Sequence, residues 1–100
     1  MGDGQPVFHE WMETGQIGNQ RAELLGRTLA YHVLTEWGDL MCAEVEIEAC
    51  NRLSKSLGAM RFEVQNRIYS AKVLRHRAQP EAALEMCEQA ISLCREIGFA

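Results

Sequence analysis

The sequence has no long apolar run and few residues that interrupt helices. Its 100 residues include only two prolines, and no stretch approaches the roughly 18 consecutive apolar residues that a membrane-spanning helix needs. The first residues also lack the basic start and the apolar run of a secretory signal. From the length and these absences we expect one domain with a modest core, no membrane partner and a cytoplasmic setting.

The pattern of a β-strand is absent as well. β-branched residues are few and scattered, and no run of Val, Ile and Thr alternates with polar residues. Between positions 20 and 97 the chain is instead rich in Ala, Leu, Glu, Arg and Met, which favour helices. The composition therefore predicts an all-α fold.

Motifs that carry chemistry are missing too. The histidines His9, His32 and His76 lie far apart, and no metalloprotease, nucleophile-elbow, phosphate-loop or dinucleotide motif occurs. The four cysteines form no pair at the close spacing that zinc sites use. The net charge of −4 argues against a nucleic-acid binder. We therefore expect no enzyme activity, no metal, no cofactor and no nucleic-acid partner.

What the sequence does contain is a repeat of forty residues. The pairs Ile17-Gly18, Leu57-Gly58 and Ile97-Gly98 recur at this spacing. The same shift superposes identical residues along the repeat: Arg21 on Arg61, Glu23 on Glu63, Arg27 on Arg67, Val33-Leu34 on Val73-Leu74, Ala43 on Ala83, Glu48 on Glu88 and Leu53 on Leu93. We therefore expect two units with one structural plan.

The pattern predicts two helices in each unit, spanning 20–37 and 40–57 in the first and 60–77 and 80–97 in the second. Gly38, Gly58 and Ala78-Gln79 separate them, with Asp39 as an N-cap and Pro80 at a first helical position. Residues three to four apart predict the buried stripes: Leu24, Thr28, Tyr31 and Leu34; Ala43, Ile47, Cys50, Leu53 and Leu57; Val64, Ile68, Ala71 and Leu74; and Ala83, Cys87, Ala90, Cys94 and Ile97. Cys42 is the cysteine that we most expect to be exposed.

These residues resemble the tetratricopeptide repeat (TPR) family in its forty-residue, long-helix form. The resemblance is carried by Gly38-Asp39-Leu40-x-x-Ala43 and Pro80-Glu81-Ala82-Ala83-Leu84, with small residues at Ala71 and Ala90 where helices approach closely. It implies a short right-handed α-solenoid of antiparallel helix pairs, with repeats at 20–58 and 59–98 and residues 1–19 as a partial helix or cap. Another array of helical hairpins and an unrelated four-helix bundle are the alternatives.

In the TPR family, the first helix of each repeat lines a concave groove that binds a peptide. By this resemblance we expect a non-enzymatic protein-protein interaction scaffold. The groove residues implied for this chain are Thr28, His32, Gln65, Lys72, Arg75 and His76, with Leu25, Thr35 and Ile68 beside them. Lys72 and Arg75 indicate an acidic peptide or a C-terminal carboxylate as the partner. Alternatively, this face is simply solvated, with Arg75 and Arg77 paired to glutamates of the following helix.

Two further expectations concern partners and the rival interpretation. Stacked repeats need neighbours to bury a continuous core, so two units leave an apolar face open at each end. We therefore expect a homodimer or a fragment of a longer repeat array. The rival interpretation is a regulatory helical bundle that senses a small ligand or the redox state through its cysteines and histidines.

Overall fold

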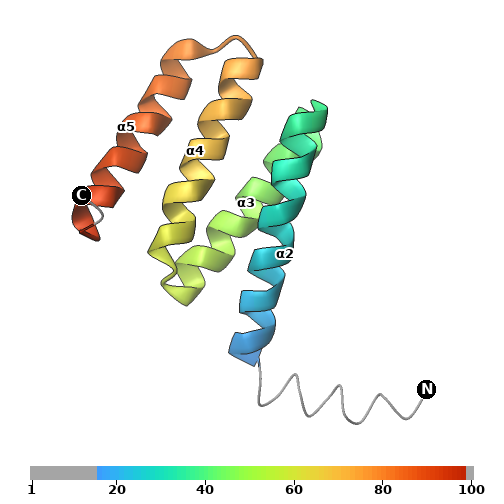
Figure 1. Cartoon of the computed structure of the whole chain (residues 1–100), viewed down its shortest axis with the longest axis vertical. Helices are drawn as coiled ribbons and strands as arrows, with labels where there is room; N and C mark the ends of the chain where they lie inside the picture. The colour runs from blue at the N-terminus through green and yellow to red at the C-terminus, as the bar shows by residue number, and fades with distance from the viewer. Residues whose placement is uncertain (1–15, 99–100) are drawn as a thin grey trace, which may run out of the picture.

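The computed structural model of the protein describes residues 16–98. This part of the chain forms four helices joined by short turns: α2 (Gln16–Trp37), α3 (Leu40–Leu57), α4 (Met60–His76) and α5 (Pro80–Glu96) (Figure 1). No strand occurs within these residues, so the prediction of an all-α fold is confirmed. α3 begins and ends where predicted, and α4 and α5 each end one residue earlier than predicted. None of the described helices is long and apolar enough to cross a membrane.

The first described helix is longer than the sequence pattern predicted. It begins at Gln16 rather than at position 20, so Gly18 lies inside α2 and does not end a preceding helix. Two of the three recurring pairs therefore mark a helix end: Gly58 and Gly98 follow helices, whereas Gly18 lies within one. Residues 1–15, for which a partial helix or cap was expected, lie outside the described residues.

The helix ends repeat every twenty residues. Gly38, Gly58 and Gly98 have φ angles of 86°, 66° and 75°, and Ala78 has a φ of 60°. This left-handed conformation reverses the chain after each helix, and glycine adopts it without the steric cost that a Cβ brings. Of these four positions, Ala78 is therefore the one that carries backbone strain.

Consecutive helices are antiparallel neighbours, because the turns that join them are short. α2 packs on α3, α3 on α4 and α4 on α5, and α2 also contacts α4 (Figure 1). Within the described residues, α5 contacts α4 alone. α4 is therefore the central helix, seated against both helices of the first unit and against its own partner in the second.

The core lies where α4 meets the first unit. Its buried apolar residues are Leu24, Tyr31, Ala43, Ile47, Cys50 and Val73. The four alanines predicted at helix contacts are all buried, with exposed fractions of 0% for Ala43, 7% for Ala71, 8% for Ala83 and 6% for Ala90. Small side chains at these positions allow the close approach of neighbouring helices that the resemblance implied.

Two residues predicted for the buried stripes are exposed instead. Ile68 on α4 is 43% exposed, and the Cys87 side chain on α5 is also exposed. Their counterparts forty residues earlier, Thr28 and Ile47, are buried within the first unit and its contact with α4. No other described helix packs on the second unit in the way that α4 packs on the first. The stripe of the second unit therefore stays open to solvent.

A polar cluster occupies the joint between the two units. The Tyr31 hydroxyl donates to Oδ1 of Asn66 at 2.8 Å. The Asn66 amide nitrogen donates to Asn51 Oδ1 at 3.1 Å and to Ser54 Oγ at 3.2 Å. Asn66 and Ser54 are fully buried, and among the described residues every buried side-chain nitrogen and oxygen has a hydrogen-bond partner. The joint therefore contains a buried polar cluster whose hydrogen bonds are all satisfied, which the apolar stripes did not predict.

Candidate functional site

Four side chains from α2 and α4 form a connected cluster where the first helices of the two units meet. The members of this His32 cluster are His32, Gln65, Tyr69 and Lys72. His32 stacks on Tyr69, with ring centroids 4.0 Å apart and ring planes inclined by 19°. The Lys72 ammonium lies 4.3 Å from the centroid of the Tyr69 ring, within the range of a cation–π contact. One aromatic stack therefore links the two units and carries a positive charge.

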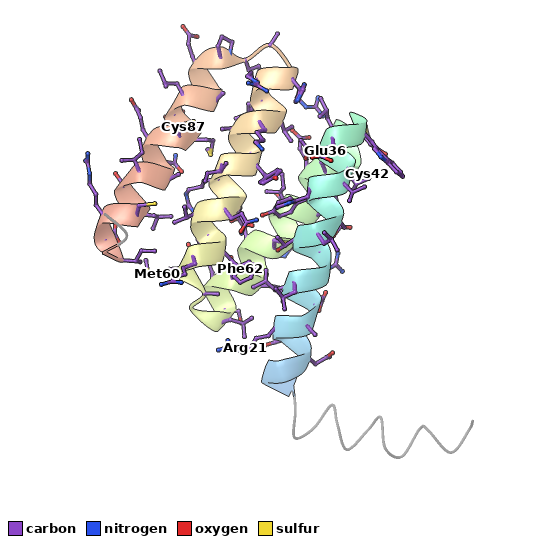
Figure 2. The ribbon with its side chains drawn as sticks, in the orientation of Figure 1. Arg21, Glu36, Cys42, Met60, Phe62 and Cys87 are labelled. Carbon is purple, nitrogen blue, oxygen red and sulfur yellow. The ribbon has the colours of Figure 1, made fainter. Side chains whose placement is uncertain are left out.

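The hydrogen bonds of the cluster determine the protonation of His32. The Gln65 amide nitrogen can only donate, and it lies 2.7 Å from Nε2 of His32, so Nε2 is the acceptor. The proton of the neutral imidazole is then on Nδ1, which donates to Tyr69 Oη at 3.2 Å. Burial lowers the pKa of His32 and the Lys72 charge lowers it further, while Glu36 near the end of α2 opposes both (Figure 2). His32 is therefore neutral at pH 7.

This arrangement provides two hydrogen-bond donors for a ligand. The Tyr69 hydroxyl accepts from His32, so its own hydrogen is not used within the cluster. Lys72 is exposed and contacts the face of the Tyr69 ring through its ammonium. A hydroxyl and an ammonium on adjacent turns of one helix suit a negatively charged acceptor such as a carboxylate.

Three of the six groove residues implied by the TPR resemblance, His32, Gln65 and Lys72, meet in this cluster. Arg75 and His76 follow within the next turn of α4, and both are exposed. Arg75 therefore extends the positive charge of the cluster toward the end of α4.

Thr28, Thr35 and Arg77 lie elsewhere than the groove and ion-pair expectations placed them. Thr28 instead confirms its other predicted position, in a buried stripe, and Thr35 is 4% exposed. Thr28 lies in the core, with an exposed fraction of 7% and its hydroxyl 3.7 Å from the Cys50 thiol. Its side chain therefore faces α3 and cannot line a groove. Arg77 pairs with Glu44 of α3 at 3.1 Å, so its partner comes from the preceding helix and not from the following one.

Tyr69 is the member of the cluster that sequence reasoning missed. The signal was present, because Gln65, Tyr69, Lys72 and His76 are spaced four, three and four residues apart and so share one face of α4. An aromatic residue at helical spacing is equally typical of a buried core position. The spacing alone therefore did not single out Tyr69 as a member of the cluster.

Cys42 and Cys50 are poorly placed to react as thiolates. A hydrogen bond with Asp39 raises the pKa of the exposed Cys42 thiol, and burial raises the pKa of Cys50. Asp39 also accepts a hydrogen bond from the Cys42 backbone N–H at 3.3 Å, which caps the start of α3 as predicted. In residues 16–98 no three His, Cys, Asp or Glu side chains come together as a metal site requires.

Comparison of the chain with protein-family models, with curated proteins and with solved structures found no significant match. The fold and the His32 cluster are therefore the basis for assigning a function.

Proposed function

We propose that this chain is a non-enzymatic TPR-like module that binds an acidic peptide, or the acidic end of a partner helix, through the His32 cluster. Repeats at 20–58 and 59–98 build a short right-handed α-solenoid, and α2 and α4 line its groove. The observation that carries this proposal is the meeting of α2 and α4 side chains in one accessible, positively charged cluster.

The pattern of helix contacts supports a stacked array over a closed bundle. In a closed four-helix bundle the first and last helices pack together. Among the described residues α2 makes no contact with α5, and neither does α3. The first helices of the two units do touch, α2 on α4. Helix pairs stacked side by side, each contacting only its neighbour, are expected to meet in this way.

The groups in and beside the cluster favour a carboxylate-bearing peptide. The Tyr69 hydroxyl and the Lys72 ammonium are donors, and Arg75 adds a second cation on the next turn. A hydrogen bond to a charged group contributes about 1.5–3 kcal/mol. Leu25 is 59% exposed and lies two turns before His32 on the same face of α2, where it offers an apolar contact to a peptide side chain.

Peptide binding tests this proposal directly. An array of short acidic peptides is prepared with free and with amidated C-termini, and the affinity of each binder is measured by fluorescence anisotropy. We expect free-carboxylate peptides to bind more tightly than their amidated forms. Lys72→Ala is expected to weaken binding about tenfold or more, because it removes one charge-assisted hydrogen bond. Tyr69→Phe is expected to weaken binding while keeping the ring stack.

The matched control is Arg52→Ala, which removes an exposed arginine of α3 outside the His32 cluster. Its affinity is expected to equal that of the wild type. The proposal is wrong if no acidic peptide binds, or if the Lys72 variant binds as tightly as the Arg52 variant.

A further inference from the structure

The chain carries two exposed apolar faces on opposite units. The first is a groove of about 490 Å³ between α4 and α5, lined by residues that include Ile68, Cys87 and Ile91. Ile68 is 43% and Ile91 51% exposed, and Figure 2 shows Cys87 between the ribbons of α5 and α4. The second is the face of α2 that bears Val33 and Trp37, which are 39% and 80% exposed. We call these the α4/α5 groove and the outer α2 face.

The first unit shows how such a groove is filled. α4 lies against α2 and α3 and places Asn66 and Val73 in the joint, with exposed fractions of 0% and 1%. Asn66 bonds to Tyr31, Asn51 and Ser54. The surface made by α2 and α3 is therefore complementary to one face of α4.

The residues on each side of this joint correspond, forty positions away in the sequence, to residues on one of the two exposed faces. On the groove side, Tyr31, Asn51 and Ser54 become Ala71, Ile91 and Cys94. On the α4 side, Asn66 and Val73 correspond to Gly26 and Val33 of α2. The α4/α5 groove and the outer α2 face thus correspond, forty residues apart, to the two sides of the joint within the chain.

The replacements on the two halves are coordinated. Within the chain the joint depends on hydrogen bonds, and a buried polar group that lost its partner would cost about 1–3 kcal/mol. At the positions that correspond to the buried Tyr31, Asn51, Ser54 and Asn66, apolar, small or weakly polar residues replace the bonded side chains on both halves. Lys72, which corresponds to His32, and Arg95, which lines the groove, are both exposed. The edge of the joint shows the same replacement of polar by apolar residues. There Arg77 pairs with Glu44, and the corresponding positions forty residues away hold Trp37 and Leu84, which are 80% and 62% exposed.

We propose that a second copy of this chain occupies the α4/α5 groove. Its outer α2 face takes the place that α4 takes against the first unit, so the forty-residue stack continues from one copy to the next. This contact is continuous in register with the interface that the chain already makes within itself, and the residues that replace the buried hydrogen-bonded cluster on both halves are uncharged. The inference goes beyond the proposed peptide binding and does not depend on it.

A contact between unlike faces has a consequence for the size of the assembly. Each dimer keeps one free α4/α5 groove and one free outer α2 face. Further copies can therefore add at both ends, and the assembly grows into a filament unless the rotation between copies closes a ring. We therefore expect the mean mass to rise with concentration and to pass twice the 11.3 kDa of one chain.

Light scattering behind size exclusion tests this with two variants. Val33→Glu places a charge on the outer α2 face, and Ile91→Glu places one in the α4/α5 groove. Each variant alone is expected to keep the mass of one chain. Mixed together they are expected to double in mass and stop there, because one retains an intact groove and the other an intact α2 face. Val45→Glu, at an α3 residue that is 64% exposed and outside both faces, is the control and associates like the wild type.

Circular dichroism and urea unfolding establish that each variant folds like the wild type. If Val33→Glu does not fold, Trp37→Glu replaces it, since Trp37 is 80% exposed. The inference is overturned if the wild type keeps the mass of one chain at every concentration, if either variant alone still associates, or if the folded variants do not pair when mixed.

Discussion

The Tyr31 hydroxyl donates a hydrogen bond to Oδ1 of Asn66 at 2.8 Å and so joins α2 to α4 at the centre of the fold. Asn66 is fully buried, and its amide nitrogen bonds to Asn51 and Ser54 of α3. Burial raises the pKa of Tyr31 well above its usual value near 10, so the hydroxyl keeps its proton. One asparagine therefore holds α4 to both helices of the first unit.

Tyr31→Phe is expected to lower the free energy of unfolding by about 1–3 kcal/mol, because it leaves Asn66 Oδ1 buried without its donor. Urea unfolding followed by circular dichroism measures the loss. Tyr69→Phe is the matched control, since its hydroxyl is only partly buried, and its loss is expected to be smaller. Equal losses in the two variants would contradict a special role for the Tyr31–Asn66 bond.

Ala78→Gly is expected to stabilise the protein by up to about 1 kcal/mol. Ala78 has a φ of 60° at a turn position that glycine occupies after the other described helices. Relief of the left-handed strain exceeds the backbone entropy that glycine adds to the unfolded chain. Ala49→Gly, inside α3, is the opposite control and is expected to cost about 0.5–1 kcal/mol. Thermal or urea unfolding that shows a loss in both variants would refute this.

His32 is expected to make stability fall at acidic pH. Its folded-state pKa lies below the unfolded value of about 6.5, so the unfolded chain binds the proton more readily. The stability that neutral His32 contributes is fully present above the unfolded pKa of about 6.5 and is lost as the pH falls through the folded-state pKa. Urea midpoints measured from neutral to mildly acidic pH should fall less in His32→Gln than in the wild type. An NMR titration that placed the His32 pKa above 6.5 would contradict the prediction.

Asp39→Asn is expected to speed the alkylation of Cys42. A hydrogen bond with Asp39 and its negative charge raise the pKa of the Cys42 thiol, and asparagine keeps the N-cap while removing the charge. The rate of reaction with iodoacetamide near neutral pH, followed by mass spectrometry of the Cys42 peptide, measures the effect. The buried Cys50 serves as an internal reference whose slow rate stays unchanged. An unaltered Cys42 rate would rule out this cause.

Helix positions were predictable because their signals are local. The bounds of α3 follow from Asp39 as an N-cap and Gly58 as a stop, and both residues act on the backbone beside them. The start of α2 was misplaced because Gly18 copies the spacing of a stop residue, while the residues on both sides of it continue the helix. A glycine is compatible with either state, so its spacing could not decide between them.

The His32 cluster was predictable only in part. His32, Gln65 and Lys72 were implied as groove residues by the TPR resemblance, which assigns side chains to one face of each first helix. His32 stacks on Tyr69 only if α2 and α4 pack with these two residues at the same position along the helix axes, and this depends on how the two units pack. Sequence spacing within one helix carries no information on the relative axial position of two helices.

By itself the sequence determined the helical class, the forty-residue repeat, the turn positions and the buried alanines at the helix contacts, because periodicity and backbone preference act over a few residues. Only the tertiary structure decided which residues of those helices are covered. Asn66 is buried because Tyr31, Asn51 and Ser54 satisfy its amide in the joint, while Ile68 is exposed because no described helix packs over it. Burial depends on what lies opposite a side chain, and that neighbour comes from another part of the chain.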